Sequence, residues 1–303
     1  MRVLVTGSRG QLGVELQCSV PDGVEVLALD LDTLDITDPA ALDNVFREFL
    51  PTTVINAAAF TAVDRAEDVP EEAFAVNARG ALNVAQAAVR AGARVIHVST
   101  DFVFDGESPR PYEPTDEPAP VNAYGKSKLE GERAVLSHAG PAALVIRTAW
   151  LYAAHGSNFV TTMLRLIGER DVVRVVADQV GTPTSASGLA RAIWSAAAKP
   201  HLHGVMHWTD AGVASWYDFA VAIREAGLAA GLLNRAAPVQ PILTRDYPTK
   251  ARRPRYSVLD KSLAWAALGI QPVHWNCALR AVLGEKQNLP LATRDSRPTT
   301  PRS

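Results

Sequence analysis

Cysteine is scarce in this chain, which has only Cys18 and Cys277 among its 303 residues. Two cysteines cannot form a disulfide framework, so we expect reduced thiols and a cytoplasmic protein. The formal net charge of −2 provides no basic field, and nucleic-acid binding therefore has no electrostatic support. No apolar run is long enough to cross a bilayer, and a strand expected from Arg2 leaves no room for a signal peptide. These absences predict a cytoplasmic globular protein without nucleic-acid or membrane partners.

The first half of the chain alternates short apolar runs with helix-length segments. The runs are continuous and rich in β-branched residues, which is typical of strands buried on both faces of a parallel sheet. We expect strands at residues 3–5, 24–29, 54–55, 95–98 and 144–146. Helices are expected between them at residues 10–19, 39–49, 71–90 and 123–137. This alternation predicts an α/β fold with a Rossmann-type, doubly wound parallel sheet.

Beyond about Thr148 the pattern becomes less regular. Helical patterns recur at residues 158–170, 187–198 and 216–226, but strands are fewer. We therefore predict an NAD(P)-binding domain at 1–148. A smaller, less regular substrate-binding domain is predicted at 149–288, with segments that can return to the sheet. Residues 289–303 contain Pro, Thr, Ser and Arg without a period and are predicted to form a flexible tail.

A glycine loop follows the first expected strand and opens the first expected helix. Its glycines are Gly7, Gly10 and Gly13, and Gln11 and Leu12 stand between the last two. Glycine permits a tight turn and the close approach of a pyrophosphate, which then meets free N–H groups at the helix N-terminus. A glycine triplet alone could be a simple strand–helix turn. The ordered strand, loop, helix and second strand favour dinucleotide binding.

The second expected strand ends near Asp30, which lies 20 residues after Gly10. A carboxylate there can accept hydrogen bonds from the adenosine ribose and would repel a 2′-phosphate, which favours NADH. Arg9 would favour NADPH instead, because its guanidinium could bind the 2′-phosphate. It could equally be a solvated loop charge. The choice between NADPH and NADH therefore stays open.

Small residues follow the third expected strand. Backbone without large side chains could approach the cofactor closely there, at the end of the strand where such folds bind ligands. The same alanines could also serve only tight helix–sheet packing. The candidate cofactor-contacting residues are Ala57, Ala58 and Ala59, with Asp35 and Ile36 beside the adenine.

A candidate catalytic set follows the fourth expected strand. Tyr124 and Lys128 are four residues apart and share one face of a helix. A phenol is a poor acid at neutral pH, and a neighbouring ammonium is expected to lower its pKa. Thr100 can add a hydrogen bond to the substrate oxygen. Together the three residues can protonate a carbonyl while hydride arrives from a nicotinamide.

Several motifs make the chain resemble the dTDP-4-dehydrorhamnose reductase family of the extended short-chain dehydrogenases. They run in order along nearly the whole chain and exclude the tail. The motifs are TGSRGQLG (6–13), NAAAFTAVD (56–64), STDFVF (99–104), YGKSKLEGE (124–132), RTAWLY (147–152), DQVGTPT (178–184), and Arg253-Pro254 with Ser257 and Leu259.

This resemblance implies NAD(P)H-dependent reduction of the C4 keto group of dTDP-4-dehydro-β-L-rhamnose to dTDP-L-rhamnose. It implies Thr100, Tyr124 and Lys128 as catalytic residues, Tyr124 being the proton donor. Tyr124 and Lys128 would also contact the cofactor. The resemblance adds Phe60 and Thr61 to the cofactor site, and it implies a nucleotide-sugar site formed by Val63, Thr100, Asp101, Trp150 and Arg253. Trp150 could instead be a core residue, and Arg253 a surface charge.

Other functions are weighed against this one. Dehydratases of the superfamily carry a Glu after the Thr-Asp pair, whereas this chain has Phe102, which leaves elimination without its second acid–base group. A 4-ketoreductase for another nucleotide-activated deoxysugar stays open. So does a non-catalytic NADP-binding subunit like the β subunit of methionine adenosyltransferase.

A magnesium ion at a dimer contact is described for some family members, and a homodimer is possible here. Glu15 stands at a fitting position for such an ion, but Ser187 stands where an acidic partner would be wanted. A hard cation needs several oxygen ligands. We therefore predict no metal site.

Overall fold

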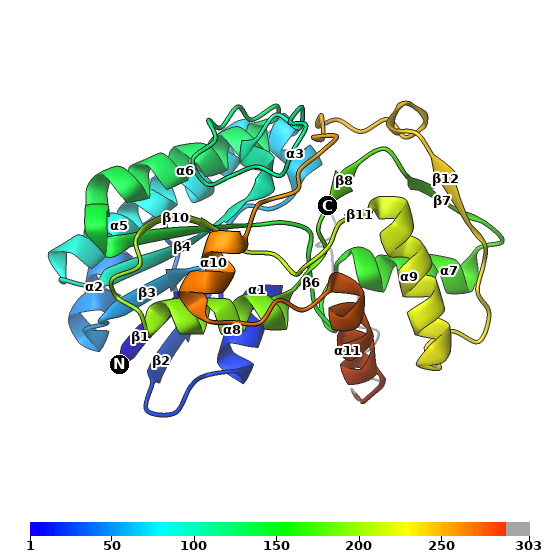
Figure 1. The fold of residues 1–303 in the computed structure, drawn as a ribbon. Coiled ribbons are helices and arrows are strands. Elements are labelled where there is room, and N and C mark those ends of the chain that lie inside the picture. The colour runs from blue at the N-terminus through cyan, green and yellow to red at the C-terminus, as the bar shows by residue number, and fades with distance from the viewer. Residues whose placement is uncertain (289–303) are drawn as a thin grey trace.

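The computed structural model describes residues 1–288. Within them, one sheet of six parallel strands has the order β10-β5-β4-β3-β1-β2 (Figure 1). This arrangement confirms the predicted α/β fold with a doubly wound sheet. The strands are β1 (Arg2–Thr6), β2 (Glu25–Leu29), β3 (Thr53–Asn56), β4 (Arg94–Thr100), β5 (Ala143–Thr148) and β10 (Gly204–His207). The first five correspond to predicted strands, whereas β10 joins the sheet from far beyond Thr148.

Helices cover both faces of the sheet because alternate strand residues point to opposite sides. Val3 and Val5 of β1 pack in one apolar cluster with α1 (Gln11–Cys18) and α8 (Ala186–Ala197). Leu4, between them, packs in a second cluster on the other face. The helices of that second cluster are α2 (Pro39–Phe49), α5 (Ala81–Arg90) and α6 (Ala123–Ala139).

The helix predicted at residues 71–90 is interrupted. It consists of α4 (Pro70–Phe74), a π-helical turn η1 (Ala75–Gly80) and α5. In that turn, the side chain of Asn77 accepts a hydrogen bond from the Phe60 N–H at 2.8 Å and donates one to the Phe60 carbonyl at 3.0 Å. π-helical turns inside helices are rare and occur frequently at functional sites. Here the turn ties the helix to the loop after β3.

A second group of helices lies beside the sheet, on the right in Figure 1. Its apolar core contains residues of α7 (Phe159–Glu169), α9 (Trp216–Ala229) and α11 (Trp275–Asn288). Three two-stranded ladders accompany it: β6 (Leu151–Tyr152) with β9 (Thr184–Ser185), β7 (Val173–Val176) with β12 (Val239–Ile242), and β8 (Val180–Gly181) with β11 (Ala214–Ser215). The helices predicted at 158–170, 187–198 and 216–226 correspond to α7, α8 and α9. The domain boundary at residue 148 stays a prediction.

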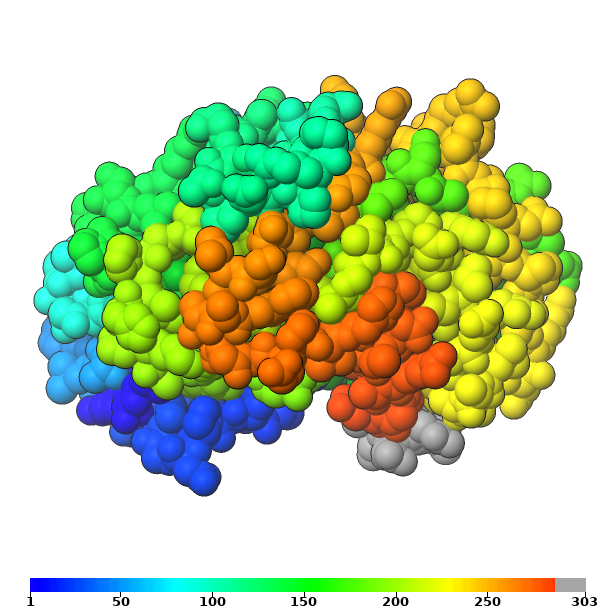
Figure 2. Space-filling view, viewed as in Figure 1, coloured from blue at the N-terminus to red at the C-terminus, as the bar shows by residue number. Residues whose placement is uncertain are grey.

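The remaining elements are short helices, several of which pack against the sheet and its helices. Helix α10 (Ser262–Leu268) packs on α8 and β10, and its orange segment is exposed near the middle of the face shown in Figure 2. The other short helices are α3 (Val63–Asp68), η2 (Asp101–Val103), η3 (Gly140–Ala142) and η4 (Thr244–Asp246). Within residues 1–288 the structure has no helix that is both long and apolar enough to span a membrane. The predicted tail at 289–303 lies outside the described residues.

Candidate active site

A cleft of about 860 Å³ opens at the carboxyl ends of the strands. Every residue predicted for catalysis, cofactor binding or substrate binding lines this cleft. The structure thus brings these residues together, and their individual roles stay predictions. These residues are Gly7, Gly10, Gln11, Leu12, Gly13, Asp30, Asp35, Ile36, Ala57, Ala58, Ala59, Phe60, Thr61, Val63, Thr100, Asp101, Tyr124, Lys128, Trp150 and Arg253. Sequence reasoning did not single out several others at the cleft, including Ser99, Thr148 and Trp216.

The glycine loop passes so close to the strand ends that side chains would not fit. Gly7 has a φ of +72°, and a Cβ there would lie 2.6 Å from the backbone nitrogen of Ala58. A Cβ on Gly13 would lie 2.2 Å from the carbonyl oxygen of Gly7. Gly10 caps α1, and its N–H donates to the Gly7 carbonyl at 3.2 Å. The loop is therefore a bare backbone cradle leading into a helix N-terminus, which fits a pyrophosphate.

Asp30 is held at the rim of this cradle. Its two carboxylate oxygens accept the backbone N–H groups of Arg9 at 2.7 Å and Leu31 at 2.9 Å. The Arg9 guanidinium turns to Asp32, at 2.6 Å, in a pair whose side chains are both more than half exposed. A fixed carboxylate and a loosely held guanidinium thus share the place where the adenosine ribose would lie.

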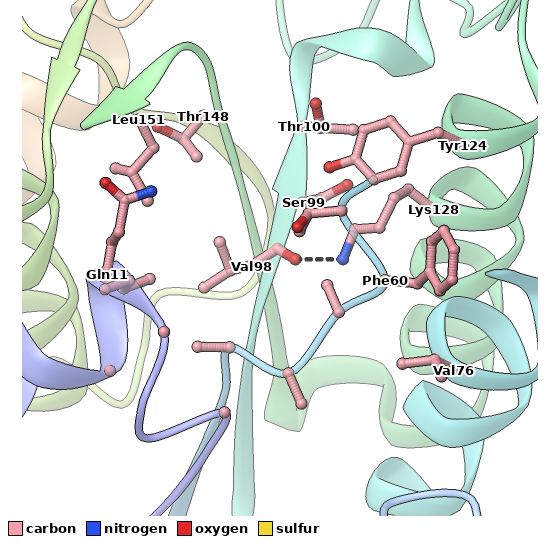
Figure 3. A pocket seen from close by; sticks show the side chains of 18 of the residues that line it. Gln11, Phe60, Val76, Val98, Ser99, Thr100, Tyr124, Lys128, Thr148 and Leu151 are labelled. Atoms are coloured by element: carbon pink, nitrogen blue, oxygen red, sulfur yellow. Dashed lines mark hydrogen bonds between the residues drawn. The ribbon is translucent and has the colours of Figure 1, made fainter. Parts of the chain in front are cut away.

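Tyr124 and Lys128 reach the cleft from the first two turns of α6. Asn122 caps this helix by accepting the Gly125 N–H at 2.7 Å. Lys128 Nζ donates to the Val98 carbonyl of β4 at 2.7 Å. Figure 3 shows Tyr124, Thr100 and Lys128 together on one wall, with Gln11 and Leu151 across from them.

Burial dominates the acidity of these groups. It raises the pKa of Tyr124 to about 12, the negative charge of Asp101 acting in the same sense and the neighbouring Thr100 hydroxyl opposing it. It lowers the pKa of Lys128 to about 8, against the opposing influence of Glu132. The expected lowering of the Tyr124 pKa by the Lys128 ammonium stays a prediction, because the largest influence on the phenol in this arrangement is its burial, which acts in the opposite direction. A phenol with this pKa carries its proton at neutral pH.

Three buried polar atoms at the cleft have no hydrogen-bond partner within residues 1–288: Asp101 Oδ2, Ser99 Oγ and Thr148 Oγ1. Asp101 Oδ1 accepts a hydrogen bond from Thr100 Oγ1 at 3.0 Å. Burial raises the pKa of Asp101 to about 6, although the nearby hydroxyls of Ser257 and Thr100 lower it. Buried polar atoms are normally satisfied, so this group indicates a place for a ligand's hydroxyl or amide groups.

The far side of the cleft is formed by Trp150 and Arg253. The Trp150 indole stacks on Trp216, with ring centroids 3.5 Å apart. Arg253 binds Asp64 of α3 with both terminal nitrogens, at 2.7 and 3.2 Å. This hydrogen bonding lowers the pKa of the Asp64 carboxyl despite its partial burial. Arg253 is thus fixed at the cleft by an acidic partner, which the sequence did not indicate.

The candidate cation position at Glu15 has a different partner. Oε1 of Glu15 lies 2.9 Å from Nε2 of His155, within hydrogen-bond distance. Within residues 1–288, no group of three or more His, Cys, Asp or Glu side chains is arranged to hold a metal ion. The sequence-based prediction that no metal is bound stays a prediction.

A Tyr and a Lys one helical turn apart, facing a glycine-cradled cleft beside the fourth strand of a parallel sheet, are characteristic of the short-chain dehydrogenases. The chain has the architecture of that class of nicotinamide-dependent oxidoreductases. Comparison with known proteins is more specific. The family model described as RmlD substrate binding domain matches residues 1–288, and the chain belongs to this family. The resemblance inferred from the motifs is therefore confirmed.

Individual relatives agree along nearly their whole lengths. A dTDP-4-dehydrorhamnose reductase of Aggregatibacter actinomycetemcomitans is 43% identical over 288 residues, which cover 93% of this chain and 98% of the relative. The crystal structure of such a reductase from Clostridium acetobutylicum has a TM-score of 0.89 and 41% identity, covering 95% of this chain and all of the other. That of the Bacillus anthracis reductase, in complex with NADP, has a TM-score of 0.88 and 36% identity, covering 94% and 99%.

Proposed function

We propose that this protein reduces the C4 keto group of dTDP-4-dehydro-β-L-rhamnose to the alcohol of dTDP-L-rhamnose, using NADPH or NADH. The observation that carries the proposal is the meeting of Thr100, Tyr124 and Lys128 in the cleft of a chain that matches reductases of this substrate over nearly its full length. The glycine cradle fits the cofactor, which when bound supplies the hydride.

The protein's own groups handle the proton. Tyr124 keeps its phenolic proton at neutral pH, because burial raises its pKa to about 12. It can therefore donate this proton to the carbonyl oxygen as that oxygen gains negative charge. Thr100 orients the same oxygen. The Lys128 ammonium, fixed by the Val98 carbonyl, stabilises the phenolate that forms.

Three parts of the cleft are suited to the sugar and its carrier. The unpaired buried oxygen of Asp101 is suited to accept a sugar hydroxyl, since it has no partner within residues 1–288. Val63 and Trp150 offer apolar surface for a deoxysugar. Arg253 can direct its remaining N–H donors to a diphosphate while Asp64 holds its terminal nitrogens.

Phe102 supports reduction over elimination. It lines the cleft and lies edge-on to Tyr124, with ring centroids 5.7 Å apart. A hydrocarbon ring cannot act as the second acid–base group that a dehydratase needs. A 4-ketoreductase for another nucleotide-activated deoxysugar uses the same parts, and it is the alternative to test directly.

The test follows the loss of nicotinamide absorbance with enzymatically generated dTDP-4-dehydrorhamnose, comparing the wild type with Tyr124→Phe. Rapid oxidation in the wild type and a loss of about 10²- to 10⁴-fold in the variant would support the proposal. Oxidation only with another 4-keto sugar would reassign the substrate. Cofactor binding without turnover of any such sugar, together with a copurifying partner, would indicate a regulatory subunit.

The cellular compartment and the oligomeric state of the enzyme are part of the proposal. We place it in the cytoplasm, since both cysteines are exposed and unpaired, as suits a reducing compartment. A homodimer stays a prediction, which light scattering of the purified protein would test.

A further inference from the structure

A pair of tryptophans from distant parts of the chain forms one wall of the cleft. Trp150 follows β5, and Trp216 begins α9. Their rings are stacked, with an interplanar angle of 6° and centroids 3.5 Å apart. Both side chains line the cleft. Trp216 is supported from another direction by Phe159 of α7, whose ring centroid lies 4.6 Å away. Trp216 could not be recognised from the sequence, where it resembles an ordinary first residue of an amphipathic helix.

The wall stands next to the reacting centre. Thr148 is the register partner of Thr100 across β5 and β4, and Trp150 comes two residues later. Trp150 is therefore carried to the end of the strand that neighbours the catalytic one. A ligand whose carbonyl meets Thr100 and Tyr124 would present its ring, rather than its distant base, to this indole. An aromatic face suits the apolar side of a deoxysugar.

The backbone of Trp150 is strained to place the ring there. Its φ is +47°, in the left-handed region that residues other than glycine rarely adopt. The strained residue is fixed from outside, because the Thr184 N–H donates to the Trp150 carbonyl at 3.1 Å and β6 directly after it pairs with β9. Strain of this kind persists only where the surroundings enforce it, and it collects at functional sites.

Gly181 provides the space for the ring. A Cβ at Gly181 would lie 2.6 Å from Cε2 of Trp150 and 2.7 Å from its Nε1. Gly181 pairs with Ala214 in the β8–β11 ladder, and Ser215 of that ladder caps α9 immediately before Trp216. The ladder therefore sets both neighbours of the indole at once: the glycine against its edge and Trp216 against its face.

We propose that Trp216 and Gly181 are positioning residues that hold Trp150 as the sugar-binding wall of the cleft. This inference rests on the proposed function and deepens it. Trp216 acts through Trp150, so its loss should weaken binding of the nucleotide sugar while leaving the cofactor site on the other side of the cleft intact. Gly181 acts by leaving room, so a methyl group there should push the indole out of place although both tryptophans remain.

The experiment compares Trp216→Ala, Trp216→Phe and Gly181→Ala with the wild type, and uses Trp265→Phe as a matched control. Trp265 packs against the α1–α8 side of the sheet and does not line the cleft. For each protein, KM for the nucleotide sugar, kcat, the Kd for NADPH and the far-ultraviolet circular dichroism are measured. Two stacked indoles give a coupled band in that spectrum, and this band reports the stack independently of activity.

Trp216→Ala and Gly181→Ala are expected to raise KM for the nucleotide sugar about tenfold, with the Kd for NADPH within about twofold of the wild type. Trp216→Phe should restore most of the affinity, because it restores a stacking partner. The coupled band should disappear in all three and persist in Trp265→Phe. A wild-type KM in Trp216→Ala, or equal losses of sugar and cofactor affinity, would overturn the inference while the function stands. A wild type that reduces no 4-keto sugar would overturn the proposed function and this inference with it.

Discussion

Lys128 Nζ is 2.7 Å from the carbonyl oxygen of Val98, and this hydrogen bond joins helix α6 to strand β4. It places the ammonium beneath the strand end that carries Ser99 and Thr100. The bond also provides an acceptor for this buried ammonium, whose pKa burial lowers to about 8 against the opposing charge of Glu132. The titration of this lysine should therefore be visible in the enzyme's activity.

We expect kcat to fall as the pH rises through about 8, because Lys128 loses its proton there and no longer stabilises the phenolate. Lys128→Arg keeps a charge at every accessible pH. This variant, though slower, should lose the alkaline limb near pH 8. A pH–rate profile of both proteins with saturating substrate tests this, and an unchanged limb in the variant would assign the titration to another group.

Asp101→Asn should make the protein more stable at neutral pH. Folding raises the pKa of Asp101 to about 6, whereas the unfolded chain ionises near the ordinary value of about 3.9. The folded state therefore holds an extra proton in this window, and stability falls as pH rises through it. At pH 7 the buried charge costs on the order of 1–3 kcal/mol, which the neutral amide removes.

The measurement is urea unfolding of both proteins at pH 7 and pH 4. The stabilisation should shrink towards zero near pH 4, where the folded wild type is already neutral at this position. KM for the nucleotide sugar should rise at least about tenfold, because the acceptor for its hydroxyl is replaced. Lower stability of Asp101→Asn at pH 7 would contradict this explanation.

Asp32 should influence the choice of coenzyme. It holds the Arg9 guanidinium in an exposed pair, which is worth at most about 1 kcal/mol and is easily exchanged for a phosphate dianion. Asp32→Asn releases Arg9 and should raise the ratio of kcat/KM for NADPH over NADH by about two- to fivefold. Arg9→Ala should lower the same ratio.

Asp43→Asn is the matched control, since it breaks an equally short exposed pair, with Arg90, on α2 and α5. The ratio should stay at its wild-type value in that protein. If Asp32→Asn and Arg9→Ala shift the ratio in the same direction, Arg9 does not act on the 2′-phosphate.

Gly125→Ala should damage both stability and activity. A Cβ at Gly125 would lie 2.1 Å from the carbonyl oxygen of Phe102, so α6 would have to move away from η2. Such a movement separates Tyr124 from Thr100. A misplacement of about 1 Å can reduce the rate about 100-fold, and overpacking costs about 1–3 kcal/mol.

Gly168→Ala in α7 provides the comparison, because a Cβ at Gly168 would have Cδ2 of Leu233 as its nearest neighbour, at an ordinary contact distance of 3.6 Å. That change should be neutral or slightly stabilising. Kinetics and thermal unfolding of both variants are the measurements. Full activity in Gly125→Ala would mean that the helix can shift without disturbing the site.

The regular part of this fold could be predicted from the sequence. The continuous β-branched runs predicted β1 to β5, since a strand buried on both faces has to be apolar throughout. Strand β10 was not predicted, because Gly204–His207 is a four-residue segment with no apolar period of its own. The interruption of the helix at Asn77 was also invisible, since it depends on a loop 17 residues earlier in the chain.

The candidate site could be predicted from the sequence because most of its residues stand in short, local motifs. Some motif residues have a structural role instead. Glu132 binds Arg147 in a fully buried ion pair between α6 and β5, and Gly181 makes room for an indole. Pairings such as Arg253 with Asp64 join residues 189 positions apart, and nothing local in the sequence indicates them.

The position of β10 has a consequence for how the protein is made. Its four residues cover the edge of β5, yet about 55 residues of other structure separate the two strands in the chain. During synthesis, the backbone of β5 therefore remains an open edge until residue 207 has emerged, and open edges invite pairing with other chains. A fragment that stops at residue 148 would keep that edge permanently. The sheet formed by the first half of the chain is therefore complete only when β10, from the second half, has paired with β5.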